Sequence, residues 1–474
     1  MLNSKLATLS SYPKKMFRTR FFALVLVLLA PAILQAQSTS PQSAPQEPPQ
    51  APSQTAWFLN QAGLYGNGEQ LPLRYEGEKA AVNLFSLSVG ASAFYDDNVL
   101  GTNNPRLDDE ALSFDSRLAL SRQTEHVNFN IDYLPFFLVY RQINQYDRIN
   151  HAGNSNLAFR LGSHFILGMH DSAAYENGVF QTLSGEGISS GTGTSAGLNQ
   201  TVLAPAAREL SNASSLDLTY LRSERTILTL FGTFDRRDFG SQVASGQGFY
   251  NGKIASGGVQ YQYRITEHVN LGLLYSYQDS RFLGYTVSLG GNSRYVDNSA
   301  VVSLAWHATP TVTLSAFGTP HYVQAYLYST GTTNGQGRVY GGGGGVLTKQ
   351  VKRTAVEFSG ERILSDGGGL LTYATSTNAD IGVRRQVVGR WEARLQVGAA
   401  RTDALLGEYS GAKLDSLQGN LIVQRPLFQG LTMRLGYEAE HQLSKGSIPL
   451  GATFDRNRVT CSIDYQLKAI QFGR

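Results

Sequence analysis

Apolar and polar side chains alternate with a period of two residues along most of the chain after residue 81. In one such stretch Val127, Phe129, Ile131 and Tyr133 are separated by polar residues, and in another only Leu274 breaks the alternation. A period of two is typical of β-strands whose two faces meet different surroundings. Similar stretches begin at Phe85, Val127, Val269, Trp391, Leu431 and Val459.

The connectors between these stretches alternate in length. We predict eight short turns, near residues 122–126, 162–165, 223–226, 265–268, 307–310, 349–353, 386–390 and 425–430. We predict nine long loops, near residues 96–109, 141–151, 176–210, 238–252, 281–297, 327–338, 366–371, 404–413 and 443–456. The sequence Thr-Glu-His-Val-Asn occurs at 124–128 and again at 266–270, both times at a short turn. The eight turns and nine loops together join eighteen strands. An even number of strands places both termini of the chain on the short-turn side.

Short turns on one side and long loops on the other are typical of outer-membrane barrels. We therefore predict an all-β fold, a transmembrane antiparallel up-and-down β-barrel of about 18 strands (16 to 20), with short periplasmic turns and long extracellular loops. A soluble sandwich or propeller also has many short strands, but it explains neither the loop asymmetry nor the persistent apolar face.

The N-terminal part of the chain has the features of an export signal. Residues 1–36 carry five Lys or Arg and no acid, followed by an apolar run from Phe21 to Ala30. That run is too short for a spanning helix, which argues against the alternative of a membrane anchor. We predict a cleaved signal peptide at 1–36, a disordered Pro/Gln/Ser-rich tether at 37–56, a periplasmic approach segment or small lid at 57–81, and the barrel at 82–474.

Composition fits an exported barrel. Removing residues 1–36 changes the formal charge of the chain from +4 to −1, so the pI near 8.9 belongs to the signal and no nucleic-acid partner is expected. Charged residues make up 16% of the chain, below the soluble average of about 25%. The single cysteine excludes an intrachain disulfide scaffold. A mean hydropathy of −0.20 excludes a polytopic helical membrane protein.

The segment from Gly90 to Val99 carries a family resemblance. Its run Tyr95, Asp96, Asp97 and Asn98 is similar to the end of the first strand in the β-barrel porin 2 family of bacterial outer-membrane proteins. The resemblance implies an outer-membrane barrel from residue 82 onwards and an association with exopolysaccharide gene clusters. The chain departs from the usual terminal aromatic residue, which leaves Leu467 and Phe472 as candidates for the assembly signal.

Charged residues on the polar faces are the candidate pore lining. They carry both signs, and two interpretations remain open: they line an aqueous channel, or they pair across strands and only support the barrel. The candidates are Asp115, Arg117, Asp132, Asp217, Glu392, Arg394, Arg434, Glu438 and Glu440.

Other chemistry finds little support. The acids at 96–97 and 108–110 lack the ligand spacing of an EF-hand, and the glycine run 341–345 lacks the Lys-Ser/Thr of a phosphate loop. We expect the glycines to permit strand bending or close packing. The Gly/Ser/Thr-rich loop 176–210 either enters the pore or stays at the surface. We expect no metal, no cofactor and no enzymatic activity.

The function expected is a porin-like channel in the bacterial outer membrane for passive passage of polar solutes, including oligosaccharides or exported exopolysaccharide. The alternatives are a non-conducting scaffold or adhesin acting through its long loops and, remotely, an outer-membrane hydrolase. Expected partners are outer-membrane lipid and lipopolysaccharide, the outer-membrane assembly machinery, and polar or saccharide solutes. The oligomeric state and the placement of residues 57–81 relative to the lumen are left open.

Overall fold

The computed structural model describes residues 82–179, 204–240, 250–284, 292–327, 335–365, 373–405, 411–445 and 453–472. The predicted signal, tether and segment 57–81 lie outside these ranges. Eighteen long strands make up almost all of the described chain: β1 (Val82–Asp96), β2 (Asp109–Gln123), β3 (Val127–Tyr140), β4 (Arg148–Leu161), β5 (Phe165–Val179), β6 (Ala204–Ser223), β7 (Thr226–Phe239), β8 (Tyr250–Thr266), β9 (Val269–Gly284), β10 (Ser293–Thr309), β11 (Val312–Leu327), β12 (Gln336–Val351), β13 (Thr354–Ser365), β14 (Ala374–Gln386), β15 (Glu392–Ala404), β16 (Lys413–Phe428), β17 (Leu431–Lys445) and β18 (Phe454–Gln466).

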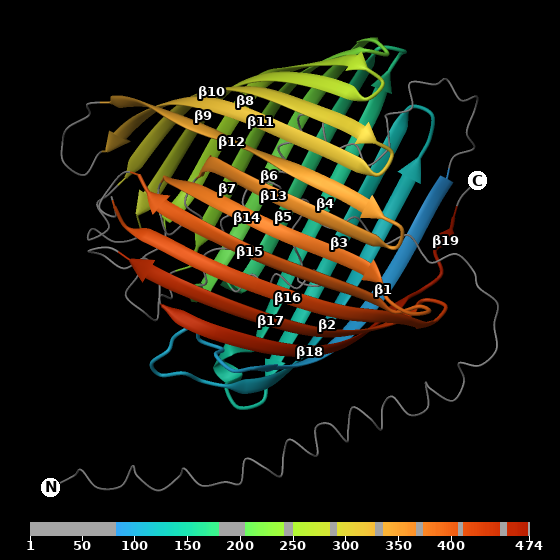
Figure 1. The fold of residues 1–474 in the computed structure, drawn as a ribbon, viewed down its shortest axis with the longest axis vertical. Helices are drawn as coiled ribbons and strands as arrows, with labels where there is room; N and C mark the ends of the chain where they lie inside the picture. Colours follow the sequence, from blue (N-terminus) through green and yellow to red (C-terminus); the bar gives the residue numbers. More distant parts are fainter. Residues whose placement is uncertain are drawn as a thin grey trace, which may run out of the picture.

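The strands form one closed antiparallel barrel (Figure 1). Each strand pairs with its neighbours in sequence, and β1 closes the wall by pairing with both β2 and β18. A two-residue strand, β19 (Ile470–Gln471), adds to the start of β1, and a 3₁₀ turn, η1 (Asn144–Tyr146), follows β3. Closure leaves no edge strand with unpaired backbone groups. The predicted fold class and the count of eighteen strands are confirmed.

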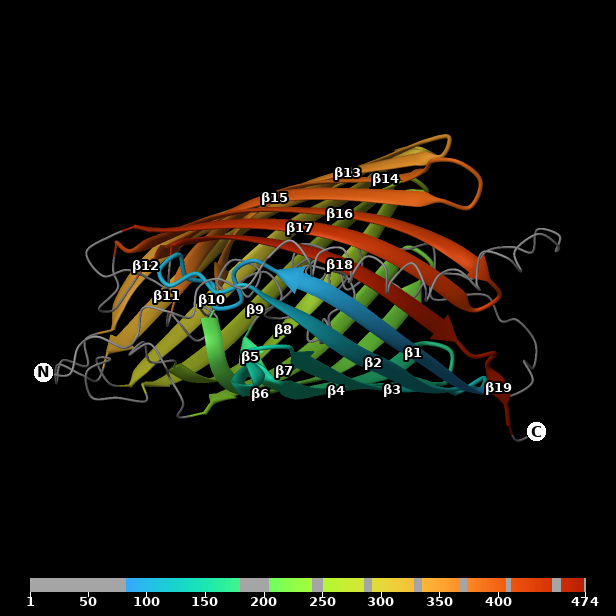
Figure 2. The same cartoon turned by 90° about the horizontal axis from the view of Figure 1, so that it is seen from below.

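The connectors follow the predicted alternation. Eight short turns lie at one end of the barrel, together with the start of β1 and the end of β18, and Figures 1 and 2 show the C-terminus at this end. Both copies of the repeated Thr-Glu-His-Val-Asn sequence lie at short turns, where the carbonyls of His126 and His268 accept hydrogen bonds from Arg160 and His307 at 2.8 Å. At the β16–β17 turn Gly430 has φ +81°, a left-handed conformation that favours glycine.

The predicted loop 176–210 is shorter than expected. Strand β5 continues to Val179 and β6 begins at Ala204, so both ends of the predicted loop are strand. The segment 204–208 contains no large apolar side chain, which hides the period of two. Residues 180–203, on which the choice between a pore loop and a surface loop depends, lie outside the described part of the chain.

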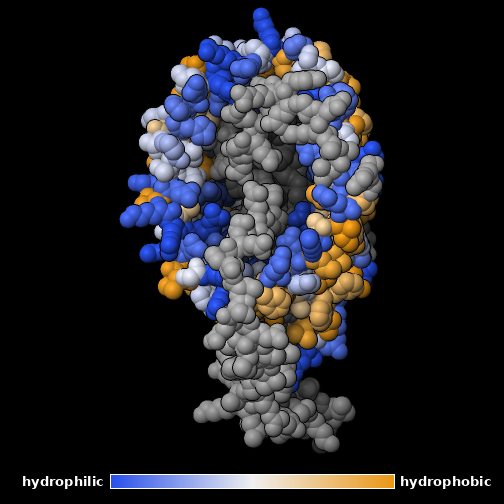
Figure 3. Space-filling model, turned by 90° about the vertical axis from the view of Figure 1, so that its right-hand side faces the viewer, coloured by the Kyte–Doolittle hydropathy of each residue, from blue (hydrophilic) through white to orange (hydrophobic). Residues whose placement is uncertain are grey.

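The wall has two unlike faces. On β2 the side chains of Leu112 and Phe114 are 51% exposed on the outside, whereas Ser113 between them is 4% exposed on the inside. The same parity holds along the other strands, so large exposed apolar side chains mark the outer face. Figure 3, which views the molecule from the short-turn end, shows hydrophobic residues gathered on one outer flank, at the lower right, and mostly hydrophilic residues on the opposite flank. No helix in the described ranges is long and apolar enough to cross a bilayer.

Part of the inner face is apolar. Leu274, Val301, Ala305, Phe317 and Val346 form a buried cluster on β9 to β12. A second cluster contains the aromatic residues Tyr250, Phe282, Tyr295 and Tyr373 toward the long-loop end. The alternation in sequence predicts a polar inner face, and in the stretch that begins at Val269 only Leu274 departs from it. Most of the inward charged residues of the predicted lining therefore lie on the rest of the wall.

The five glycines of residues 341–345 lie in β12, where all five pair with β11 and residues 343–345 also pair with β13. A side chain at Gly344 would meet the backbone oxygen of Gly360 at 2.5 Å and the Cβ atom of Glu361 at 2.7 Å. The outward Gly341, by contrast, has no neighbouring atom within 4 Å of such a side chain. The inward glycines of this run therefore permit close packing, as expected.

We predict that Gly344→Ala lowers the free energy of unfolding by about 1–3 kcal/mol, because its methyl group overlaps backbone that cannot move without disturbing the ladder. The matched control Gly341→Ala adds the same methyl group in open space. Urea unfolding in lipid vesicles measures both, and equal stability of the two variants would contradict the packing argument.

Candidate functional site

The nine predicted pore-lining residues all lie on the inner face. On β15 the outward positions are marked by Leu395 and Val397, and on β17 by Leu435 and Tyr437, all exposed. The charged residues of these two strands have the opposite parity. On β6 the exposed Leu216 similarly places Asp217 inside. Their functional role in lining a pore remains a prediction.

Several of these residues form ion pairs with one another or with a neighbour. Arg117 on β2 binds Asp132 on β3, with Nη2 2.7 Å from Oδ1. Glu392 and Arg394, two residues apart on β15, are joined at 2.7 Å between Oε1 and Nε. Arg434 on β17 lies 3.5 Å from the Oδ2 atom of Asp464 on β18. Pairing across and along strands thus compensates much of the inward charge.

The two remaining acids of β17 pair with arginines that are also buried. Glu438 binds Arg458, and Glu440 Oε2 lies 3.4 Å from Nη1 of Arg456. Asp217 faces His170, with Oδ1 3.4 Å from Nε2. Asp115 lies over Gly90, where a larger residue would overlap its carboxylate. The charged side chains thus face inward and several of them pair, while the lining of an aqueous channel stays a prediction.

The sequence analysis did not identify the arginines that pair with the acids of β17. Arg456 and Arg458 lie on β18 with the same parity as Thr460 and Ser462, just before the stretch that begins at Val459. Extending the alternation three residues upstream would have found both. Glu209 and Arg237, which pair at 2.9 Å between β6 and β7 and are nearly buried, were also missed.

The Asp-Asp-Asn run at the end of β1 joins the first strand to the last. Asp96, fully buried, accepts hydrogen bonds from Nε of Arg456 at 3.1 and 3.0 Å and also binds its Nη2 atom. Arg458 lies beside this pair, with its guanidinium 5.5 Å from the ring centroid of Phe94. The charge pair therefore lies directly at the seam where the barrel closes.

The next two residues extend the contact. Asp97 accepts hydrogen bonds from the backbone and side-chain nitrogens of Asn457 at 2.7 and 2.9 Å, and it pairs with Arg106 at 2.6 Å. Asn98 donates to the carbonyl of Asp455 at 2.8 Å. We call Asp96, Asp97 and Asn98, with Arg456 and Asn457, the clasp. Tyr95 faces away from it and donates to Asp108 at 3.1 Å.

An acid at the end of the first long loop accepts hydrogen bonds from backbone nitrogens of the second. Asp109 Oδ2 accepts from the backbone nitrogens of Gln142 and Ile143 at 2.9 and 3.0 Å, which ties the first two long loops together. Glu110 lies 3.3 Å from Arg141. Within the described ranges, no group of three or more His, Cys, Asp or Glu is placed to hold a metal ion.

The two candidates for the assembly signal both follow β18 and bind to β1. The backbone nitrogen of Leu467 donates to Leu87 at 2.9 Å, and that of Phe472 donates to Asn83 at 3.2 Å. Both side chains are exposed. The structure brings them to the same seam as the clasp, at its opposite end, and their role in assembly remains a prediction.

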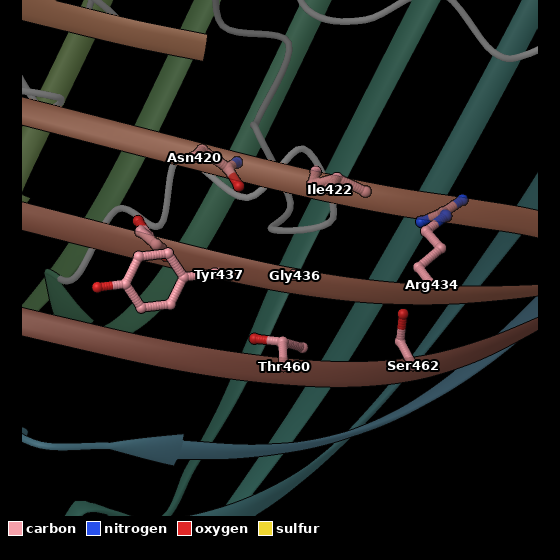
Figure 4. Close-up of a pocket in the computed structure, with 8 residues that line it drawn as sticks. Asn420, Ile422, Arg434, Gly436, Tyr437, Thr460 and Ser462 are labelled. Atoms are coloured by element: carbon pink, nitrogen blue, oxygen red, sulfur yellow. The ribbon is translucent and has the colours of Figure 1, made fainter. Parts of the chain in front are cut away.

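A recess opens in the inner wall at Gly436, where β17 carries no side chain (Figure 4). An amide, a guanidinium and two hydroxyl groups surround it, from Asn420 on β16, Arg434 on β17, and Thr460 and Ser462 on β18. Ile422 supplies an apolar edge. Glu438 adds a carboxylate to the lining of the recess.

No family model matches the chain, and no curated protein matches it. Similar solved structures include OccAB4 of Acinetobacter baumannii, with a TM-score of 0.45 and 11% identity, covering 84% of this chain and 100% of that one. OpdQ of Pseudomonas aeruginosa has a TM-score of 0.42 and 9% identity, covering 81% of this chain and 97% of that one. The FrpB iron transporter of Neisseria meningitidis has a TM-score of 0.44 and 8% identity, covering 81% of each chain. At such low scores and identities the fold rests on the strand pairing above, and no solute follows from these proteins.

We predict that Asp96→Ala lowers the free energy of unfolding by about 3–5 kcal/mol, because it leaves the buried Arg456 without its principal counter-charge at the seam. Asp108→Ala removes an exposed acid of the same loop and is expected to cost less than about 1 kcal/mol. Urea titration in vesicles compares them. Similar losses for both variants would show that the clasp does not hold the seam.

Proposed function

We propose that the protein is a passive channel for polar solutes in the bacterial outer membrane. The observation that carries this proposal is the placement of polar and charged side chains on the inner face of a closed eighteen-stranded wall. Barrels of 16 to 18 strands are wide enough for an aqueous lumen. The exposed apolar outer face suits lipid. In this proposal the chain needs no catalytic residue and no cofactor, and it is exported through the signal at 1–36.

The charge pattern favours neutral, hydroxylated solutes. Inward acids and bases compensate each other in pairs such as Arg117–Asp132 and Glu392–Arg394, so a solute meets hydrogen-bonding groups and little net charge. The recess at Gly436 offers the same chemistry at one place on the wall. Within this proposal, oligosaccharides or an exopolysaccharide are the finer assignment. The resemblance of the Asp-Asp-Asn run, which forms the clasp, to the β-barrel porin 2 family supports this assignment.

Reconstitution tests the channel directly. We predict stepwise, ohmic conductance in planar bilayers and swelling of proteoliposomes in isotonic neutral sugars. A folded barrel that neither conducts nor admits sugars would overturn the proposal. In that case the long loops, as an adhesin or scaffold, would be the better explanation.

We predict that Glu392→Gln shifts the ion preference toward anions, because it removes a negative charge from the lumen wall. Asp415 lies on the outer face of β16, bound by Arg401 and Lys445. Asp415→Asn therefore removes the same charge outside the lumen. The reversal potential in a KCl gradient is measured for both. An equal shift for the two variants would place Glu392 outside the conducting path.

We predict that Gly436→Phe slows sugar entry more than it lowers ion conductance, because the ring fills the recess where hydroxyl groups are expected to bind. Gly419 faces outward, with no atom within 4 Å of an added side chain. Gly419→Phe therefore makes the same change on the outer face. Liposome swelling and conductance are recorded for each. Unchanged sugar flux in Gly436→Phe would remove the recess from the solute path.

A further inference from the structure

Four positively charged side chains lie in one row across the outer face of β7 to β10. Arg236 on β7 lies directly opposite Lys253 on β8, and Lys253 lies opposite Arg281 on β9. Arg281 in turn lies opposite Arg294 on β10. Each of the four shares the parity of the exposed apolar residues on its own strand, which places it outside the barrel. We call these four residues the basic row.

The basic row lies at the edge of the apolar belt, on the long-loop side. On β9 the outward residues from Val269 to Tyr277 are all apolar or aromatic, and Arg281 follows four residues later. A tilted strand crosses the hydrocarbon core in about 9–11 residues, so this stretch is long enough to span it. On β10 the outward residues from Trp306 to Ala300 are likewise apolar. The basic row is therefore placed at the level of the lipid headgroups.

Acidic side chains neutralise only part of the basic row. Nε of Arg236 lies 2.7 Å from Oδ2 of Asp238. Asp279 binds two arginines, accepting from Nε and Nη2 of Arg294 at 2.9 Å each and from Nη2 of Arg281 at 3.1 Å. The lysine in the middle of the row is exposed and forms no ion pair with any described residue. Two acids thus serve four cations.

This arrangement is costly for the protein alone. Like charges directly opposite each other in a sheet are destabilising, because their Cβ atoms are only about 4.5–5.5 Å apart. The opposed pair Lys413 and Lys445, on the outer face of β16 and β17, is fully compensated. Asp403 lies 3.4 Å from Lys413, and Asp415 lies 2.7 Å from Lys445. The basic row lacks an acid for each cation, so an anion from outside the chain would relieve its repulsion.

The surroundings of the basic row favour an anion that belongs to a lipid. Arginine binds phosphate through paired hydrogen bonds, and clusters of Lys and Arg at a membrane surface attract anionic headgroups. The row borders the apolar belt on one side, so a ligand that contacts both surfaces carries phosphate groups and acyl chains. Three steps between neighbouring strands give the row a length of about 14 Å, which is long enough to contact more than one phosphate.

We propose that the basic row binds the phosphate groups of lipid A, the membrane anchor of lipopolysaccharide in the outer leaflet. Lipid A carries phosphate groups on an acylated disaccharide and therefore matches both the charge and the apolar border of the site. At the end of the row, the ring centroid of Tyr326 lies 5.9 Å from Cζ of Arg294 and adds an aromatic surface at headgroup level. The inference rests on the outer-membrane placement in the proposed function, and it does not depend on conduction.

Lipopolysaccharide binding to the full chain, refolded in detergent free of lipopolysaccharide, tests the proposal. Native mass spectrometry measures the affinity for purified lipopolysaccharide and for the same material with its lipid A dephosphorylated. The native protein should bind the phosphorylated form about tenfold or more tightly. The double variant Lys253→Gln/Arg281→Gln should weaken that binding by about tenfold or more, since it removes two of the four cations.

The matched control is Lys413→Gln/Lys445→Gln, which also removes two opposed cations from the outer face toward the long loops. It should leave the affinity unchanged. Equal losses in the two double variants, equal binding of dephosphorylated lipopolysaccharide, or complete competition by inorganic phosphate would overturn the proposal.

Two further measurements separate lipid binding from a role in folding or conduction. In vesicles without lipopolysaccharide, Lys253→Gln/Arg281→Gln should resist urea at least as well as the native protein, because it relieves repulsion in the basic row. A less stable variant would show that the row supports the fold. Conductance is recorded for the same samples, and a conducting barrel that binds no lipopolysaccharide would overturn this inference while leaving the channel proposal intact.

Discussion

The structure depends on the need to pair every backbone N–H and C=O group within the wall. In a membrane no water can satisfy them, so a sheet must close on itself. The chain meets this need by pairing β1 with β18 over nine residues, from Ser88 to Asp96. The two strands come from opposite ends of the barrel sequence, so their union is the step that turns a long meander into a barrel.

Closure also explains where the strongest polar contacts lie. At the long-loop end of the seam, the buried Asp96–Arg456 pair adds side-chain bonds to the backbone ladder, and Asp97 and Asn98 bind the neighbouring part of β18. At the short-turn end, Leu467 and Phe472 continue the backbone pairing with β1. The seam is thus secured at both ends. Buried charge is tolerated there because each carboxylate has an arginine beside it.

Once the wall is closed, the pleat assigns every side chain to lipid or lumen. The lumen does not receive a uniform lining: ion pairs occupy β2–β3 and β15–β18, while an apolar cluster around Leu274 and Phe317 occupies the wall formed by β9 to β12. The inward glycines of β12 pack closely against the neighbouring strands β11 and β13. The result is a lumen with a polar side of compensated charge and an apolar side.

Local pattern explains which features could be predicted from the sequence. The period of two residues, the short turns and the nine inward charged residues all follow from neighbours in sequence. Leu274 appeared only as a break in the alternation, because its meaning depends on Val301 and Val346 on other strands. Likewise the Asp-Asp-Asn run was visible, but its partner Arg456 is 360 residues away. The ends of β5 and β6 lacked large apolar residues, so their extent was hidden.

The most direct test compares two adjacent residues of β16. Gln418 faces inward, and Leu417 is 52% exposed on the outer face. In a Cys461→Ala background, each is replaced by cysteine and treated with a charged, membrane-impermeant methanethiosulfonate in intact outer membranes. A water-filled lumen predicts rapid labelling of Gln418→Cys and protection of Leu417→Cys by lipid. Protection of both residues, or labelling of Leu417→Cys alone, would contradict the account.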